Sequence, residues 1–160
     1  GVIPFKGIYM RKNFDIGKVV EIKLENGLYC YAMVIGEPLV AFSEHFFEEP
    51  QSDFDAMFDD STFCIWVMKY ALGGNGWMKV GKINNHPMLN QTYEFYKFDL
   101  ISKKFSIYSG GIETPATREE CLGLECAAVW DKSHVEDRLL AKSKGEQCVW
   151  TTSLSAATRV

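Results

Sequence analysis

The sequence carries few of the features that mark membrane spans, nucleic-acid contacts or phosphate sites. No apolar run approaches the roughly 18 residues that a membrane-spanning helix needs. Lys and Arg form no cluster, and the net charge of −4 argues against a protein that neutralises phosphates. The glycine-rich stretches 73–76 and 109–111 contain neither a complete GxxxxGKS/T loop nor a GxGxxG fingerprint, so they predict turns. We therefore expect neither a membrane nor a nucleic acid as a direct partner.

Histidine is scarce and the cysteines have no regular spacing, which limits the metal and redox chemistry that the chain can hold. None of the three histidines, His45, His86 and His134, has a second His or Cys at the short spacings that zinc sites commonly use. The cysteines are odd in number and irregularly spaced: Cys30, Cys64, Cys121, Cys126 and Cys148. This pattern predicts reduced, mostly buried thiols in a cytoplasmic protein, with no disulfide framework, metal or cofactor.

One group of residues imitates a catalytic set. His134 follows Asp131 and precedes Asp137, as a hydrolase of the nuclease type would require. An imidazole in the first turn of a helix is disfavoured as a cation, so His134 is more simply interpreted as a surface residue. Glu119 and Glu120 are adjacent and diverge on a helix, so they cannot form a converging acid–base pair. We predict that the chain is not an enzyme, with a hydrolase built on the histidine as a rival.

Apolar residues make up 47% and aromatic residues 14% of the chain, which favours strands. Asn26-Gly27 between the apolar runs 19–24 and 28–35 predicts a tight β-hairpin. Further strands are predicted at 39–42, 62–70, 77–80, 92–99 and 104–108, with 62–70 central and the last two forming a hairpin.

Helices are predicted only near the end of the chain. Thr117 with Glu120, and Ser133 with Glu136, read as capping boxes that begin helices at about 118–123 and 134–143. The tail 145–160 is expected to add an edge strand. This order predicts an α+β fold over residues 1–160 as one domain: a strongly bent, mostly antiparallel, barrel-like sheet with one or two C-terminal helices packed against it.

The segment 44–60 combines a high negative charge with regularly placed apolar residues. It holds no Lys or Arg, and its acidic residues are Glu44, Glu48, Glu49, Asp53, Asp55, Asp59 and Asp60. A solvated loop whose phenylalanines dock on the core would explain this composition. A docking face for a basic partner would explain it as well, with the acidic side chains and Phe54 as the contact set. An EF-hand is not indicated, because the loop glycine and terminal Glu are missing.

Several short, loosely defined motifs lie between residues 17 and 142. They are an opening hairpin, GKVVEIKLENGLYCYAMV (17–34), followed by Ala41-Phe42, Gly76-Trp77, Val80-Gly81, Phe105–Tyr108, Ala116–Cys121, Leu124-Glu125, Ala128–Trp130 and Val135–Leu139. This pattern resembles the immunity protein 26 family, found beside toxin genes in bacterial polymorphic toxin and contact-dependent inhibition systems. The resemblance implies a cytoplasmic protein that binds and blocks a cognate toxin.

An inhibitor of this kind needs a complementary surface and no catalytic residues. A nuclease toxin has a positive cleft that holds nucleic acid, so the acidic segment would suit it and would cover its active site or an adjoining exosite, helped by the loop 84–92. Within the motifs, Glu125, Trp130 and Arg138 are interpreted as a structural clamp between strand and helix. The alternative is a small-molecule or peptide binding module, with the ligand enclosed among Tyr29, Tyr31, Trp66 and Trp77.

Overall fold

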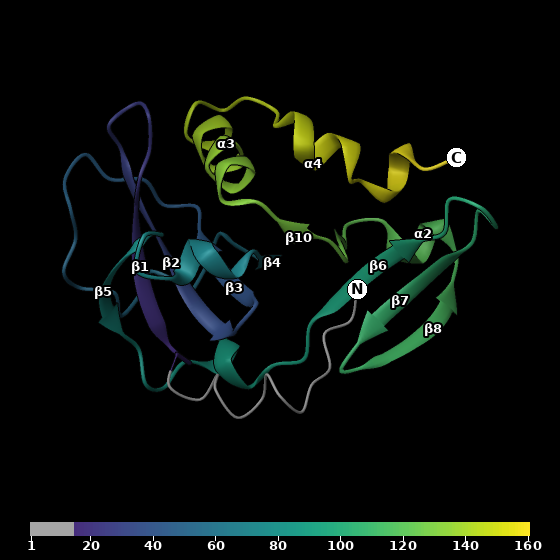
Figure 1. Cartoon of the computed structure of the whole chain (residues 1–160), viewed down its shortest axis with the longest axis horizontal. Coiled ribbons are helices and arrows are strands. Elements are labelled where there is room, and N and C mark those ends of the chain that lie inside the picture. The colour runs from purple at the N-terminus through teal and green to yellow at the C-terminus, as the bar shows by residue number, and fades with distance from the viewer. Residues whose placement is uncertain (1–14) are drawn as a thin grey trace.

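The computed structural model describes residues 15–160, which form two β-sheets and a set of short helices (Figure 1). The first sheet has the order β10-β4-β3-β2-β1-β5, and the second has the order β8-β7-β6-β9. The strands of the first are β1 (Lys18–Lys23), β2 (Tyr29–Gly36), β3 (Leu39–Ser43), β4 (Thr62–Val67), β5 (Met78–Lys82) and β10 (Val129–Trp130). Those of the second are β6 (Glu94–Phe98), β7 (Phe105–Ser109), β8 (Ile112–Ala116) and β9 (Glu125–Cys126). The α-helices are α2 (Arg118–Cys121), α3 (Lys132–Ser143) and α4 (Val149–Ser153), and the 3₁₀ turns are η1 (Lys69–Leu72), η2 (Pro87–Asn90) and η3 (Ala156–Thr158).

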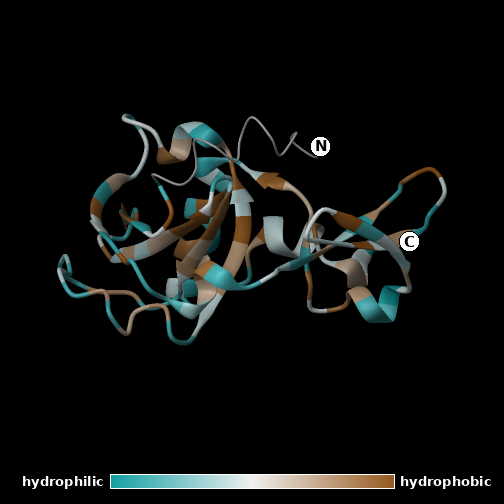
Figure 2. Ribbon diagram, turned by 90° about the horizontal axis from the view of Figure 1, so that it is seen from below, coloured by the Kyte–Doolittle hydropathy of each residue, from teal (hydrophilic) through white to brown (hydrophobic). Residues whose placement is uncertain are grey.

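The first sheet is covered on both faces. β2 contains six consecutive buried residues, which requires packing on both sides because successive side chains of a strand point to opposite faces. Val20 and Ile22 face the cluster that includes α3, whereas Val19 faces the cluster that includes Met57 and Phe58. Figure 2 shows hydrophobic residues concentrated in these strands. The acidic segment 44–60 therefore closes the face opposite α3.

The predicted hairpins are confirmed. β1 and β2 pair antiparallel in the register Val19↔Met33, and Gly27 has the positive φ of 88° that the turn requires. β6 and β7 also pair antiparallel. The strand predicted to be central, β4, has a neighbour on each side, β3 and β10. Among the strands of residues 15–160, β9 and β10 pair in parallel with β6 and β4, and the others pair antiparallel, which gives the α+β class.

The sequence predicts one barrel-like sheet, whereas the structure has two separate sheets. The chain leaves the first sheet after β5 and begins the second at β6. Trp66 of β4 joins them, with its ring centroid 4.7 Å from that of Phe95 and 5.7 Å from that of Tyr108. β9 then pairs with β6 and β10 with β4, so consecutive short strands belong to different sheets. β9 and β10 thus connect the two sheets, and neither sheet closes into a barrel.

The helix starts are half confirmed. Thr117 and Glu120 form the expected capping box at α2. The second box is wrong: Asp131 caps α3 by accepting from the backbone N–H of Ser133 at 3.0 Å. Glu136 instead accepts a hydrogen bond from the indole N–H of Trp77 at 3.0 Å.

The tail is helical, not an edge strand. Its residues form α4 and η3 and connect the two sheets, because Trp150 packs on the core of the first and Ala156 is buried against Tyr96 of the second. The Tyr96 hydroxyl donates to the backbone carbonyl of Leu154. Tertiary contacts of this kind override the weak strand preference of the sequence.

Candidate functional site

The acidic segment 44–60 is fixed against the first sheet, on the face opposite α3. It leaves β3 after Ser43, and Phe47 exchanges two backbone hydrogen bonds of 2.8 and 2.9 Å with Tyr29. The Tyr31 hydroxyl accepts from the backbone N–H of Gln51 at 2.6 Å and donates to Glu21 at 2.9 Å. Burial raises the pKa of Tyr31 to about 12, so this hydroxyl keeps its proton at neutral pH. These contacts fix the backbone of the segment.

The apolar residues of the segment belong to the core. Phe54, Met57 and Phe58 are buried, and the ring centroid of Phe54 lies 5.4 Å from that of Tyr31. Glycine at position 81 makes room for Phe54, since a Cβ there would come within 2.9 Å of its ring. Phe54, expected as part of the contact set, is therefore an anchor to the protein's own sheet and is not displayed on the surface.

Two of the acidic residues are engaged by histidines. Asp60 lies 2.6 Å from Nε2 of His45, and Asp59 lies 3.1 Å from Nε2 of His86. His86 is only 7% exposed, and its Nδ1 accepts from the backbone N–H of Met88 at 3.1 Å. Because Nδ1 accepts, the proton of a neutral ring sits on Nε2, which donates to Asp59. The loop before η2 is thereby tied to the acidic segment.

The other exposed acidic residues carry unpaired charge. Within residues 15–160, no Lys, Arg or His side chain forms an ion pair with Glu48, Glu49, Asp53 or Asp55. All four are exposed, whereas Glu44 is half-buried. Asp53 uses one carboxylate oxygen to accept from the backbone N–H of Asp55 at 3.1 Å. We call these four residues, Glu48, Glu49, Asp53 and Asp55, the acidic face.

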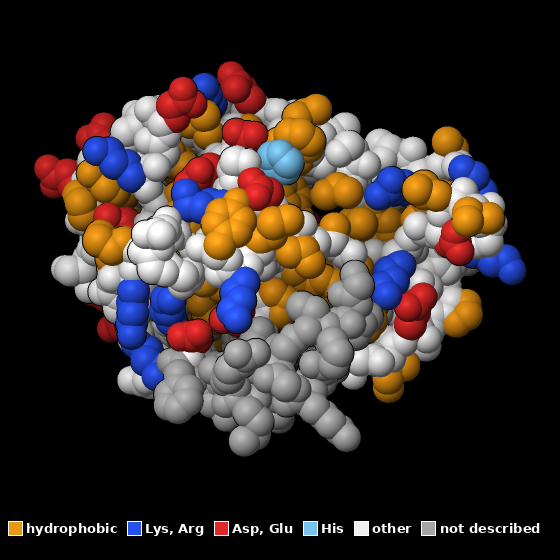
Figure 3. Space-filling view, viewed as in Figure 1, with side chains coloured by type: hydrophobic (Ala, Val, Ile, Leu, Met, Phe, Trp, Pro, Cys, Tyr) orange, Lys and Arg blue, Asp and Glu red, His pale blue; other side chains and the backbone are white. Residues whose placement is uncertain are grey.

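Charge is unevenly distributed over the molecule. On the side drawn in Figure 3, acidic side chains gather mainly over the first sheet and α3. At the far end of the second sheet, Lys and Arg side chains flank hydrophobic ones. On this side, Lys and Arg side chains also lie among the acidic ones over the first sheet.

The three residues interpreted as a clamp come together. Arg138 donates to the two carboxylate oxygens of Glu125 at 3.0 and 2.7 Å. Its guanidinium lies 3.7 Å from the ring centroid of Phe63 and 5.2 Å from that of Trp130. Glu125 belongs to the second sheet, whereas Phe63 and Trp130 belong to the first. The ion pair thus spans the junction between the sheets.

The residues of the rival hydrolase each have another partner. The hydroxyls of Ser133 and Tyr70 donate to Asp131 and lower its pKa to about 2. The His134 ring stacks on Trp150 at a centroid distance of 3.8 Å, and the indole N–H of Trp150 donates to Asp137 at 2.9 Å. These contacts fasten the start of α3 and the tail.

The aromatic residues proposed to enclose a small ligand are dispersed. Trp77 is buried in the cluster beneath α3, and Tyr31 in the cluster on the opposite face of the sheet, where Tyr29 packs at its border. Trp66 lies between the sheets. The sheet itself therefore separates Trp77 from Tyr29 and Tyr31.

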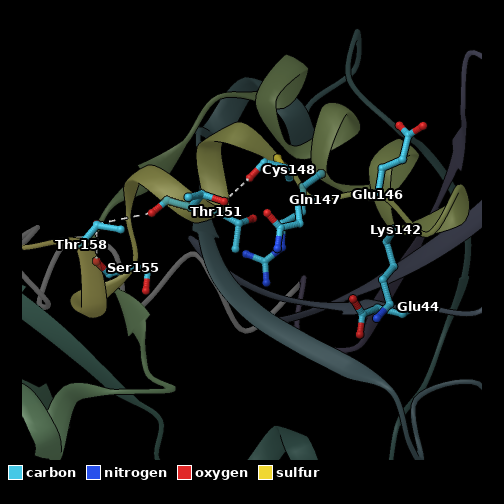
Figure 4. A pocket seen from close by; sticks show the side chains of 10 residues that line it. Glu44, Lys142, Glu146, Gln147, Cys148, Thr151, Ser155 and Thr158 are labelled. Carbon is cyan, nitrogen blue, oxygen red and sulfur yellow. Dashed lines mark hydrogen bonds between the residues drawn. The ribbon is translucent and has the colours of Figure 1, made fainter.

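A cleft between α3 and α4 is a feature that the sequence did not indicate, because the tail was expected to be a strand. Its volume is about 420 Å³ (Figure 4). It is lined by Glu44, Arg138, Lys142, Glu146, Gln147, Cys148, Thr151, Thr152, Ser155 and Thr158. We call it the α3–α4 cleft.

Two negative findings hold for the described residues. No group of three or more His, Cys, Asp and Glu side chains is arranged to hold a metal ion. None of the helices there has the length and apolar character needed to cross a membrane.

Comparison with protein families decides the class of the protein. The family model of immunity protein 26 matches residues 15–107, more than half of the chain. The chain belongs to the immunity protein 26 family. A search of curated proteins and a search of solved structures each returned no significant match. The matched region ends within β7, so the clamp and the closing motifs of this family member lie beyond it. Membership indicates an immunity function, the neutralisation of a toxin.

Proposed function

We propose that this immunity protein 26 member acts in the cytoplasm of a bacterium by binding a basic toxin domain, of the nuclease class, through its acidic face. Binding covers the active site of the toxin or an adjoining exosite. The toxin is one delivered by a neighbouring cell in a polymorphic toxin or contact-dependent inhibition system. The observation that carries the proposal is a set of four exposed carboxylates that form no ion pair within residues 15–160, on a backbone anchored to the sheet.

The negative charge of the acidic face is complementary to the positive charge expected of a nuclease toxin. A nuclease must present a positive cleft to hold the phosphates of its substrate. Exposed carboxylates without internal partners keep their field available, which steers a cationic protein toward them and raises the association rate. Asp59 and Asp60 are already engaged by histidines, so we assign the steering to Glu48, Glu49, Asp53 and Asp55.

Rigidity adds to the affinity. Ordering a loop on binding costs free energy, and a loop that is already ordered avoids that cost. Phe54 and the hydrogen bond from Gln51 to Tyr31 hold the segment in place before any partner arrives. The loop before η2, which His86 joins to the segment, enlarges the surface that the toxin can contact. A standard interface buries roughly 800 Å² on each partner.

The proposal is tested by reversing the charge of the acidic face. The variant E48K/E49K/D53K/D55K is compared with the unmodified chain for binding to the toxin domain encoded beside its gene. Four rim charges at about 0.5–1 kcal/mol each predict a loss of about 30- to 1000-fold in affinity, mostly in the association rate. The melting temperature should change little, because none of the four side chains forms an ion pair within residues 15–160 and the one hydrogen bond that Asp53 accepts, from the backbone N–H of Asp55, is exposed.

A control separates this effect from net charge. The variant E25K/E94K/E119K reverses three exposed carboxylates that form no side-chain hydrogen bond or ion pair with other described residues and lie outside the segment. It should bind the toxin within a few-fold of the unmodified chain. Unchanged affinity in the E48K/E49K/D53K/D55K variant would remove the acidic face from the mechanism.

A further inference from the structure

We propose that Met78 is the apolar anchor of the surface that binds the toxin, beside the acidic face. This inference rests on the proposed function and adds to it the residue that slows the release of the toxin. Met78 begins β5, the edge strand of the first sheet, and is 61% exposed. Single exposed apolar residues are common on protein surfaces, so the place of Met78 on the sheet decides what it contacts.

Met78 lies on the same face of the sheet as the acidic segment. It pairs with Glu21 across β5 and β1, and Glu21 pairs with Tyr31 across β1 and β2. Directly paired residues of antiparallel strands share a face, so the three side chains form a row. Tyr31 belongs to the cluster on the face opposite α3, and Val80, two residues after Met78, packs against the same cluster. A strand spacing of about 4.8 Å places the backbone of Met78 about 10 Å from that of Tyr31.

The row connects Met78 to the acidic segment. The Tyr31 hydroxyl donates to Glu21 and accepts from a backbone N–H of the segment. Within residues 15–160, Glu21 forms no ion pair, so its negative charge adds to that of the acidic face. The cation on that face of β1 is Lys23, which lies 5.6 Å from the ring centroid of Tyr29 and leaves Glu21 unpaired. Met78 therefore lies beside a surface of net negative charge.

The acidic segment itself exposes no large apolar side chain. Phe54, Met57 and Phe58 are buried, and its other phenylalanines are half-buried. Carboxylates at the rim of an interface mainly raise the association rate, whereas slow dissociation requires a group that fills a pocket on the partner. Met78 supplies such a group, because methionine is enriched at interfaces and its flexible thioether adapts to the shape of a pocket.

Continuity with the acidic face identifies the toxin as the partner of Met78. An interface that buries roughly 800 Å² on each side covers a disc of about 16 Å radius, which is wider than the step from Tyr31 to Met78. A basic toxin that docks on the acidic face therefore reaches Met78 on the same face of the sheet. A second copy of this chain fits less well, since a symmetric dimer through this face would bring two acidic faces together. The pocket that receives Met78 should be apolar and bordered by Lys or Arg.

Replacing Met78 tests the inference. M78A and M78Q should each lower the affinity for the toxin domain about tenfold or more, mainly through faster dissociation, and the loss should be similar at low and high salt. M78L should bind within a few-fold of the unmodified chain, because Leu keeps the apolar volume. The matched control is M68A, since Met68 is 41% exposed and follows β4, near the opposite edge of the sheet. It should bind within about twofold of the unmodified chain.

The outcomes separate this inference from the proposed function. Unchanged affinity in M78A or in M78Q overturns the inference, and if E48K/E49K/D53K/D55K loses affinity in the same assay, the proposed function stands without the anchor. Loss of affinity in M78A but not in the charge variant would keep the anchor and remove the acidic face. Light scattering of the free protein gives the remaining outcome: a dimer that M78A converts to a monomer would assign Met78 to self-association and overturn the inference as well.

Discussion

Breaking the Glu125–Arg138 ion pair should loosen the junction between the two sheets. The pair joins β9 of the second sheet to α3, which packs on the first, and Arg138 also lies over Phe63 of β4. We consider three variants: E125Q, R138M and the double variant. Gln keeps the shape of Glu without its charge, and Met keeps much of the aliphatic stem of Arg without the guanidinium.

The structure sets the magnitude. The side chains of Arg138 and Glu125 are 12% and 28% exposed, so the pair is shielded but not fully desolvated. Hydrogen bonds to charged groups contribute about 1.5–3 kcal/mol in such places, and the contact with an aromatic ring adds about 0.5–1 kcal/mol. We expect R138M to lower the free energy of unfolding by about 2–3 kcal/mol and E125Q by about 1–2 kcal/mol. The coupling energy of the cycle should be about 1–2 kcal/mol.

The assay is urea unfolding at neutral pH, with the coupling energy taken from the four midpoints and a common slope. The control cycle uses K97M and E113Q, since the pair Lys97–Glu113 lies on the surface of the second sheet with side chains 32% and 49% exposed. Its coupling should be near zero, and no more than about 0.5 kcal/mol. A coupling for the first pair that is as small as for the control would refute the clamp.

Three further predictions concern stability and reactivity. Trp130 is 4% exposed, so W130A should cost about 3–5 kcal/mol through the cavity it leaves, and a normal melting temperature would contradict its place in the core. The lowered pKa of Asp131, about 2 against an ordinary 3.8, means that its charge stabilises the fold above about pH 4 and that this contribution is lost as the pH falls toward 2. D131N should therefore be less stable than the unmodified chain near neutral pH, and thermal melts should show the difference shrinking in acid; a constant difference would argue against this linkage. Burial raises the pKa of Cys30 and Cys64 to about 12, so iodoacetamide at about pH 8 should leave both unmodified in the native protein while it labels the partly exposed Cys148, as mass spectrometry would show.

Local signals predicted the local structure well. The Asn26-Gly27 turn and the Thr117–Glu120 capping box each depend on a few neighbouring residues, and both are present in the structure. The failed box at Ser133 shows the limit. Asp131, two residues earlier, also caps well, and the sequence offers no means to rank two adjacent candidates.

The candidate site was predictable in its charge but not in its geometry. Composition alone singled out the segment 44–60. Its periodicity could not show that Phe54 would be buried against Tyr31, or that His45 and His86, distant in sequence, would each engage an aspartate. The division between engaged and free carboxylates therefore came from the structure.

From the order of residues alone came the α+β class, the first hairpin, the acidic segment and the family resemblance, because each depends on composition or on neighbours along the chain. Tertiary structure decided the split into two sheets, the place of the predicted clamp residues across their junction, and the α3–α4 cleft. The physical reason is that β9 and β10 are two residues long, too short for any periodic signal, and acquire their strand conformation only by pairing with β6 and β4.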